Sequence, residues 1–202
     1  MSFSQQKEDK EIEEALVRDL QAGNLEAYDK IAELYQKKIY GLSFNLVRNQ
    51  MDAQDVTQEV FLTIFRKVHT FQGKSAFSSW VYRVALNAVY MKLRSKKKDQ
   101  SISVEDAFPS FNGAGYHQEV IRDWSESAES LMFSNETKNV IQSAVDQLPE
   151  KEKIAFLLRD VEGLSTEEAA EALDLSISAI KSRLHRARLI LRKKLSGYFK
   201  EK

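Results

Sequence analysis

Hydrophobic residues recur at spacings of three and four along most of the chain, a pattern typical of helices that bury one face. Asn24 can cap a long helix over residues 25–46, and a short amphipathic helix over residues 12–23 precedes it. Residues up to about Asp9 lack the pattern and are expected to be disordered. Glycine and proline are scarce, at 7 and 2 residues, and β-branched alternation is weak. The chain is therefore predicted to be all-α.

A helix is also predicted over residues 52–68, because an aspartate suits a helix amino terminus and apolar residues follow in helical register. Its apolar positions are expected to be buried: Val56, Val60, Phe61, Leu62, Ile64, Phe65 and Val68. The opposite face carries Asp55, Gln58, Glu59 and Arg66, which the pattern alone interprets as solvated. Neighbouring acids can also indicate catalysis, but no nucleophile accompanies them, so we do not expect an enzyme.

The stretch from Phe71 to Ser95 predicts a loop around Gly73 and then a helix over residues 78–95. Two apolar stripes are expected to be buried on this helix: Trp80, Val84, Ala88 and Met91 on one side, and Tyr82, Leu86, Val89 and Leu93 on the other. Between the stripes lie Arg83, Asn87, Tyr90 and Arg94. Rings stack on unpaired bases, amides read base edges and cations follow phosphates, so this strip indicates single-stranded nucleic acid. An ordinary polar surface is the alternative, and the residues alone leave it open.

The stretch from Leu164 to Leu195 is typical of a helix-turn-helix. Ser165 and Glu168 have the spacing of a capping box, and the first helix is expected to end near Asp174. Ser176 or Ser178 can cap the second helix, whose inward positions are Ile180, Leu184, Ala187, Leu191 and Leu195. Its outward face would place four residues near the bases or phosphates of a major groove: Ser178, Lys181, Ser182 and Arg186. A solvated basic helix on an unrelated bundle is the alternative.

Charge is segregated along the chain, although 30 basic and 30 acidic residues sum to zero. Segments 60–98 and 175–200 hold basic residues and no acid, whereas segment 99–129 is acidic apart from Arg122. Two basic segments suit a protein that meets nucleic acid with two surfaces. The absence of cysteine excludes disulfides, thiolate metal sites and cysteine nucleophiles. No signal sequence or membrane-spanning run is seen, so we expect a cytoplasmic protein without membrane insertion.

Four segments, taken in order, resemble the extracytoplasmic-function group of bacterial sigma factors. They are AYDKIAELYQKKIYGL, DAQDVTQEVFLTIF, FQGKSAFSSWVYRVALNAVYMKLR and, after a variable linker, LPEKEKIAFLLRDVEGLSTEEAAEALDLSISAIKSRLHRARLILRKKL. The resemblance spans roughly Leu25 to Leu195 apart from the linker. It implies a protein that binds core RNA polymerase, recognises two promoter elements and helps to open the duplex. It also implies an anti-sigma factor as a partner.

The resemblance assigns roles to individual positions. Docking on core polymerase is implied for Asp52, Asp55, Gln58 and Glu59, in place of the solvated interpretation. The segment from Phe71 to Trp80, which includes Phe77, matches the loop and helix start that hold a flipped base of the melted downstream element. Trp80, Arg83 and Asn87 match positions that face the non-template strand, in agreement with the strip that continues to Tyr90 and Arg94. The upstream element would be read by the helix that carries Lys181, Ser182, Arg183 and Arg186.

These observations predict two small helical domains, residues 12–97 and 135–199, joined by a flexible acidic linker over residues 98–134. The first would dock on polymerase and melt the downstream element, and the second would carry the helix-turn-helix. Trp124 in the linker has no assigned role. We expect no cofactor and no metal. The alternative function is a stand-alone transcriptional regulator whose amino-terminal domain oligomerises or binds a ligand.

Overall fold

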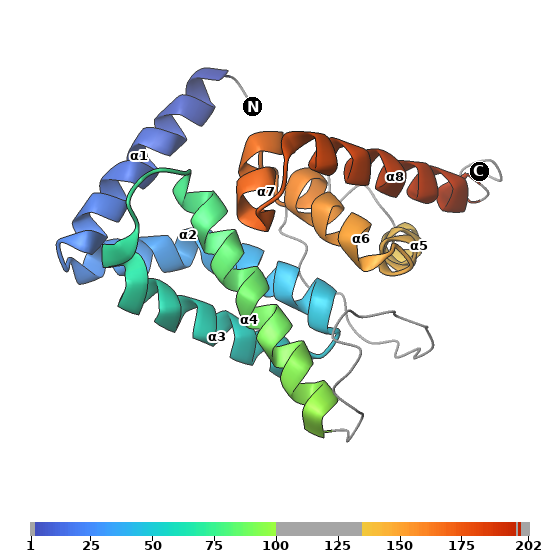
Figure 1. Cartoon of the computed structure of the whole chain (residues 1–202), viewed down its shortest axis with the longest axis horizontal. Coiled ribbons are helices and arrows are strands. Elements are labelled where there is room, and N and C mark those ends of the chain that lie inside the picture. The colour runs from blue at the N-terminus through green and yellow to red at the C-terminus, as the bar shows by residue number, and fades with distance from the viewer. Residues whose placement is uncertain (1–2, 100–134, 197, 199–202) are drawn as a thin grey trace.

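The computed structural model describes residues 3–99, 135–196 and 198, and all regular structure in these ranges is helical (Figure 1). The amino-terminal region contains α1 (Phe3–Gln21), α2 (Leu25–Val47), α3 (Gln50–Lys67), the 3-10 turn η1 (Val68–Thr70) and α4 (Phe77–Asp99). The carboxy-terminal region contains α5 (Asn135–Asp146), α6 (Glu150–Phe156), the π-helical turn η3 (Leu157–Val161), α7 (Thr166–Leu173) and α8 (Ile177–Leu195). The all-α prediction is confirmed. Within the described ranges no helix combines the length and apolarity needed to cross a membrane.

Helix ends in the amino-terminal region follow from local capping chemistry. The Oδ1 of Asn24 accepts a 2.9 Å hydrogen bond from the Glu26 amide, as the sequence predicted. Helix α2 ends where Arg48 adopts a left-handed φ of 55°. Asn49 then caps α3 through a 3.0 Å bond from the Asp52 amide to its Oδ1, so the helix begins earlier than the prediction at Asp52. A side-chain acceptor satisfies one of the amides that a helix start leaves unpaired.

Helix α1 begins at Phe3, so the expectation of disorder up to about Asp9 was wrong. The segment is rich in Gln, Lys and Glu, which are good helix formers even without apolar periodicity. The carboxy-terminal end of α1 is anchored because Val17 and Leu20 are buried. A helix anchored at one end extends outward more easily than an isolated helix nucleates.

Some apolar residues that were expected to be buried are exposed. Leu62 and Phe65 on α3 are 38% and 50% exposed, and Met91 on α4 is 72% exposed. The buried line of α3 is narrow, with Val56, Val60 and Ile64 facing α2 and α4. Phe65 instead rests with its ring edge-on to Tyr28, at 5.4 Å between ring centroids. Helical periodicity locates a face but not its width, which depends on how many neighbours pack against the helix.

The helix-turn-helix packs on α6 through a continuous apolar line. Ile180, Leu184, Ala187 and Leu191 of α8 are buried, and Leu195 packs partly against the same core. Helix α7 contributes Ala169, Ala170 and Ala172, whose small side chains let it lie close to its neighbours. The buried residues of α8 confirm the inward positions predicted for the second helix.

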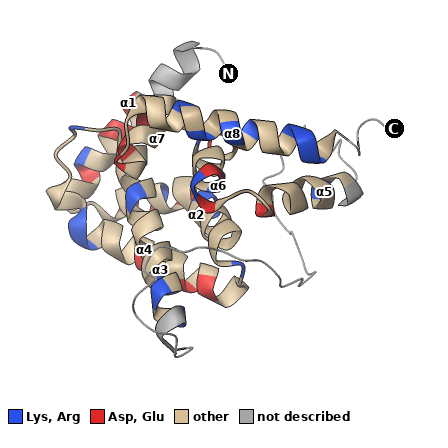
Figure 2. Ribbon diagram, turned by 45° about the vertical axis from the view of Figure 1, so that its right-hand side comes forward, with Lys and Arg blue, Asp and Glu red and all other residues tan. Residues whose placement is uncertain are grey.

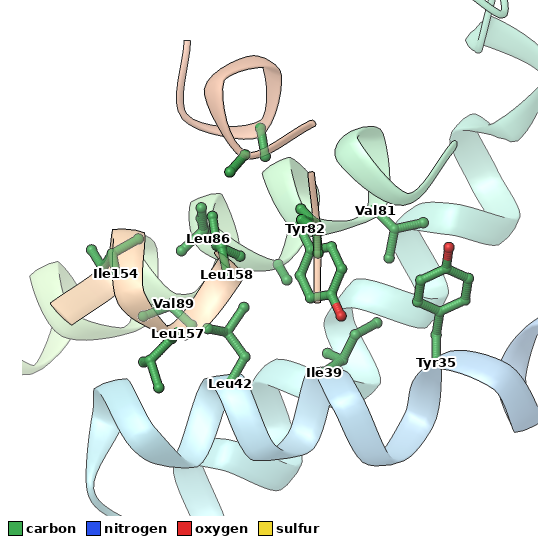
Figure 3. Close-up of a cluster of buried hydrophobic side chains, with 14 of the residues drawn as sticks. Tyr35, Ile39, Leu42, Val81, Tyr82, Leu86, Val89, Ile154, Leu157 and Leu158 are labelled. Atoms are coloured by element: carbon green, nitrogen blue, oxygen red, sulfur yellow. The ribbon is translucent and has the colours of Figure 1, made fainter. Parts of the chain in front are cut away.

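One hydrophobic core extends through both regions. Leu42 of α2 and Leu86 and Val89 of α4 lie in one cluster with Leu157 and Leu158 of η3 (Figure 3). The predicted pair of helical regions is confirmed, and the structure adds that they pack against each other. Helix α4 ends at Asp99, so residues 98 and 99 of the predicted linker are helical. The rest of that linker, with Trp124, lies outside the described residues.

Candidate nucleic-acid interface

Both helices of the helix-turn-helix begin at a capping serine, and a left-handed residue ends the first. The Oγ of Ser165 accepts a 3.0 Å bond from the Glu168 amide, and the Glu168 carboxylate accepts a 2.7 Å bond from the Ser165 amide. Asp174 ends α7 in the left-handed conformation, with a φ of 54°. Ser176 is the cap of α8, through a 3.2 Å bond from the Ala179 amide. The predicted capping box is confirmed, and Ser176 rather than Ser178 is the cap of the second helix.

The exposed face of α8 carries most of the predicted upstream-element residues. Ser178, Lys181, Ser182 and Arg186 are exposed, whereas Arg183 is partly buried. Lys and Arg are spaced along the length of α8 (Figure 2). The Nε of Arg186 donates to Glu152 at 2.8 Å, and its Nη1 donates to Ser182 Oγ at 2.9 Å. These bonds hold the guanidinium close to the helix surface.

Glu152 and a second acid restrain two arginines of α8 in a way that sequence reasoning missed. Arg188 forms a bidentate pair with Asp160, at 2.9 and 2.6 Å. Both acids lie on the α6–η3 segment, 34 and 28 positions before their arginines. Helical periodicity within α8 carries no information on such partners.

An aromatic cluster occupies the loop and helix start predicted to hold a flipped base. Phe77 is 3% exposed and stacks on Trp80, with ring centroids 5.5 Å apart. Phe71 packs against both rings, at 5.4 and 5.7 Å between centroids. Gln21 at the end of α1 donates from Nε2 to the carbonyl oxygens of Val68 and Phe71, at 2.9 and 2.8 Å. The structure therefore brings the predicted aromatic residues together, and Phe77 is the buried member of the cluster.

Helix α4 presents the predicted strip on its exposed side. Arg83, Asn87, Tyr90 and Arg94 are exposed, and Met91 joins them on the same side. Burial and the nearby Glu150 raise the pKa of Tyr90, against the opposing effect of Arg183. Tyr90 thus lies close to charged residues of α6 and α8. The polar strip was readable from the sequence, but its proximity to the other region was not.

The acids predicted to dock on polymerase fall into two environments. Asp55, Gln58 and Glu59 are exposed on α3, but Asp52 is only 7% exposed. The Nζ of Lys92 lies 3.3 Å from Asp52 and 2.8 Å from Asp55, and Lys96 also pairs with Asp52. Burial would raise the pKa of Asp52, but hydrogen bonds from Lys96 and Lys92 bring it below its usual value. Asp52 therefore ties α3 to α4 in this structure.

Polar contacts also join α4 to α7 and to the turn before α7. Tyr82 donates to Glu162 at 2.8 Å, and Ser78 donates to Glu168 at 3.3 Å. Arg83 donates to the backbone carbonyl of Glu171. Each pair is separated by 80 or more positions, so no local sequence pattern could have revealed it.

The described residues contain no group of three or more His, Asp or Glu side chains placed to hold a metal ion. The arrangement offers hydrogen-bond donors, cations and aromatic rings, which recognise nucleic acid without covalent chemistry. Fold and surfaces together define a DNA-binding protein of two helical regions.

Both regions of the chain match known protein families. Residues 31–99 match Sigma-70 region 2, and residues 138–191 match Sigma-70 region 4. The RNA polymerase sigma-H factor of Pseudomonas aeruginosa is 34% identical over 194 residues, which cover 95% of this chain and 97% of that protein. The ECF RNA polymerase sigma factor SigW of Bacillus subtilis is 30% identical, covering 89% of this chain and 94% of that protein. The chain therefore belongs to the extracytoplasmic-function (ECF) group of sigma-70 family sigma factors, which are alternative sigma factors of transcription initiation.

Two solved structures share the fold. CnrH, in complex with the cytosolic domain of CnrY, has a TM-score of 0.61 and 22% identity, covering 91% of this chain and 96% of CnrH. RpoE of Bartonella quintana, in complex with the anti-sigma factor NepR, has a TM-score of 0.61 and 20% identity, covering 84% of this chain and 96% of RpoE.

Proposed function

We propose that this sigma factor brings core RNA polymerase to two-part promoters, reads the upstream element as duplex and holds the downstream element as a melted strand. The proposal rests on one observation: the chain exposes two surfaces of different chemistry, each suited to a different form of DNA. One is the capped helix-turn-helix, whose α8 exposes Lys181, Ser182 and Arg186. The other is the exposed strip of α4 beside the aromatic cluster.

Helix α8 suits duplex recognition because Ile180, Leu184, Ala187 and Leu191 pack inward and its polar side is outward. A helix of this kind fits the major groove, where Arg and Lys read guanine edges or phosphates. Ser178 and Ser182 are short enough to let the helix approach the bases closely. Arg186 must exchange its bond with Glu152 for a DNA contact.

The α4 strip suits unpaired bases because it combines a cation, an amide and rings along one helix side. Asn87 can read a base edge, and Arg83 and Arg94 can follow phosphates. Trp80 stands beside Phe71 and Phe77 and offers a ring face or edge to a flipped base. Unstacking a base costs a few kcal/mol, which such contacts offset by stabilising the open form. No catalytic residue is needed for this step.

Docking on polymerase is proposed for the exposed side of α3. Asp55, Gln58 and Glu59 are accessible there, together with the exposed apolar side chain of Leu62. Asp52 is buried next to this surface and holds α3 against α4, because its carboxylate pairs with lysines of α4. An anti-sigma partner is also proposed, since the related RpoE was solved in complex with the anti-sigma factor NepR.

The test is reconstitution of the purified chain with core RNA polymerase, followed by sequencing of the DNA upstream of the transcripts. We expect transcripts that start downstream of a shared two-part motif and that depend on the added chain. Promoter binding by the chain alone as a dimer on paired half-sites, with no transcription from core polymerase, would overturn the proposal.

A further inference from the structure

Arg188 on α8 forms an ion pair of two hydrogen bonds with Asp160 on η3. Its Nε and Nη2 donate to the two carboxylate oxygens, at 2.9 and 2.6 Å. These two nitrogens share one edge of the planar guanidinium, so a single carboxylate takes up that edge. Asp160 does not use the second edge, which Nη1 and the remaining hydrogen of Nη2 form. The side chain of Arg188 is 58% exposed in spite of the pair, so a second acceptor has room to approach.

Arg186 is held in a different way. Its Nε donates to Glu152 and its Nη1 donates to Ser182, so donors on both sides of the guanidinium are in use. A DNA contact by Arg186 therefore requires an exchange of partners. Arg188 requires no exchange, because both of its bonds to Asp160 come from one edge.

Asp160 lies on a rigid part of the backbone. The amide of Glu162 donates to the carbonyl of Leu157 at 2.9 Å within the π-helical turn, and Leu157 and Leu158 are fully buried. The side chain of Asp160 is 21% exposed. A carboxylate fixed in this way orders the long side chain of Arg188 before DNA arrives, so less conformational entropy is lost on binding.

Arg188 lies on a flank of α8 that carries further cations. It comes two helical turns after Lys181, about 10 Å along the axis, and one turn before Arg192. Both of these neighbours are exposed. Arg188 also follows the buried Ala187, about 100° around the helix, so it lies beside the buried line. When a helix lies in the major groove, such a flank faces the sugar–phosphate backbone.

We propose that Asp160 is a positioning residue for DNA binding, which holds Arg188 so that the second edge of its guanidinium binds a phosphate beside α8. The inference rests on the proposed function, because it assumes that α8 enters a major groove. A phosphate suits this edge, since its oxygens accept two parallel bonds from a guanidinium. Charge alone would predict the opposite role for Asp160, because a carboxylate repels phosphates. Asp160 also lies before the helix-turn-helix, so the proposal adds a residue outside that motif to the DNA-binding machinery.

The first test is a double-mutant cycle, in which Arg188→Ala is introduced into the wild-type chain and into Asp160→Asn. The readout is the affinity of the full chain for a mixed-sequence DNA duplex, measured by fluorescence anisotropy at several salt concentrations. Phosphate contacts carry no sequence information, so no promoter is needed. The effect of Arg188→Ala is taken within each background, so the charge change of Asp160→Asn cancels. The control is the same cycle with Lys193→Ala, in the last turn of α8.

We expect Arg188→Ala to weaken duplex binding about tenfold and to lower the salt slope by about 0.9 when Asp160 is present. In Asp160→Asn the guanidinium is no longer held, so the loss should shrink to about threefold or less. Lys193→Ala should have the same effect in both backgrounds. An equal or larger loss from Arg188→Ala in Asp160→Asn would overturn the proposal, because Asp160 would then not help Arg188 to bind DNA.

The second test is Arg188→Lys, which also covers the case in which Asp160→Asn does not fold. Lysine keeps a charge that can pair with Asp160, but its ammonium has no second edge to offer. We expect the variant to unfold in urea as the wild type does and to bind the duplex about tenfold more weakly. Wild-type affinity of Arg188→Lys would overturn the proposal, since the ion pair would then serve only to hold α8 on η3.

A failure of the proposed function gives a different result. If the chain directs no transcription by core polymerase, but its duplex binding depends on Arg188 and Asp160 as expected, only the proposed function is contradicted. If the chain directs transcription and Arg188→Lys binds the duplex normally, only the positioning role is contradicted. A wild-type chain that does not bind the duplex even at low salt contradicts both.

Discussion

The hydroxyl of Tyr82 donates a 2.8 Å hydrogen bond to the carboxylate of Glu162, which links α4 to the turn before α7. Tyr82 is 1% exposed, so the acceptor sits at the edge of the core. Burial raises the pKa of Glu162, the bond from Tyr82 and the charge of Lys38 lower it by less, and the resulting pKa is about 7 instead of the usual 4.5. A raised carboxyl pKa means that the folded state favours the protonated form.

The first prediction concerns how the raised pKa of Glu162 makes stability depend on pH. The contribution of Glu162 to stability should be fully present below about pH 4.5 and lost as pH rises through about 7. Glu162→Gln stays neutral, so its unfolding free energy should exceed that of the wild type increasingly over this window and by a constant amount above it. Urea unfolding of both proteins at several pH values measures the difference. A difference independent of pH would show that Glu162 keeps an ordinary pKa in the fold.

A second prediction concerns the core shared by the two regions. Leu157 is fully buried, so Leu157→Ala should lower the unfolding free energy by about 2–5 kcal/mol. Leu189→Ala removes the same atoms from a residue that is 51% exposed, and should change the unfolding free energy by about 0.5 kcal/mol or less. Chemical denaturation followed by circular dichroism distinguishes them. Similar effects of the two substitutions would contradict the packing.

The third prediction addresses the surface for unpaired bases. Asn87→Ala and Trp80→Ala should impair open-complex formation much more than binding to core polymerase, because both side chains face the proposed melted strand. Permanganate reactivity of promoter thymines measures opening, and a pull-down with core polymerase measures binding. Gln36→Ala on the exposed side of α2 is the control. Normal permanganate reactivity in both strip variants would refute their assignment.

A fourth prediction separates base reading from phosphate binding on α8. Lys181→Ala and Arg186→Ala should weaken promoter use by about 1–3 kcal/mol where a base edge is read. A side chain that binds a phosphate should instead reduce the salt slope of binding by about 0.9 when it is removed. Lys193→Ala in the last turn of α8 should change only the salt slope. The helix does not enter the groove as proposed if upstream selectivity and salt dependence are unchanged in the first two variants.

The fifth prediction tests the docking side of α3. Asp55→Ala and Gln58→Ala should each weaken binding to core polymerase, and a residue at the centre of the interface should contribute more than about 1 kcal/mol. Asp29→Ala removes an exposed carboxylate from α2 and is the control. Affinity is measured with labelled chain and core polymerase in solution. Unchanged binding of both α3 variants would move the docking surface elsewhere.

Local signals in the sequence predicted local structure well. Asn24, the Ser165–Glu168 capping box and the apolar line of α8 lie where their spacing placed them. These features depend on residues within one or two helical turns, so a linear pattern contains them. The predicted strip of α4 is likewise exposed along one side, although its binding role stays a prediction.

Features that depend on distant neighbours were missed or misplaced. Met91 was expected in a buried stripe, but it is 72% exposed. Asp52 was grouped with the residues implied to dock on polymerase, and the structure shows that it is buried and paired with lysines from α4. The bonds from Tyr82 to Glu162 and from Arg83 to Glu171 depend on how two regions pack that are far apart in the sequence. Periodicity carries no information on such packing.

The side-chain amide of Gln21 in α1 donates to the carbonyls of Val68, where η1 begins, and of Phe71, which follows η1, at 2.9 and 2.8 Å. The aromatic loop that follows is therefore braced by a helix that lies outside the segment matched to region 2, which starts at residue 31. A version of this chain trimmed to the matched segment would keep the rings but lose their brace. Its loop should exchange amide hydrogens faster, and experiments on promoter melting should use the chain with α1 retained.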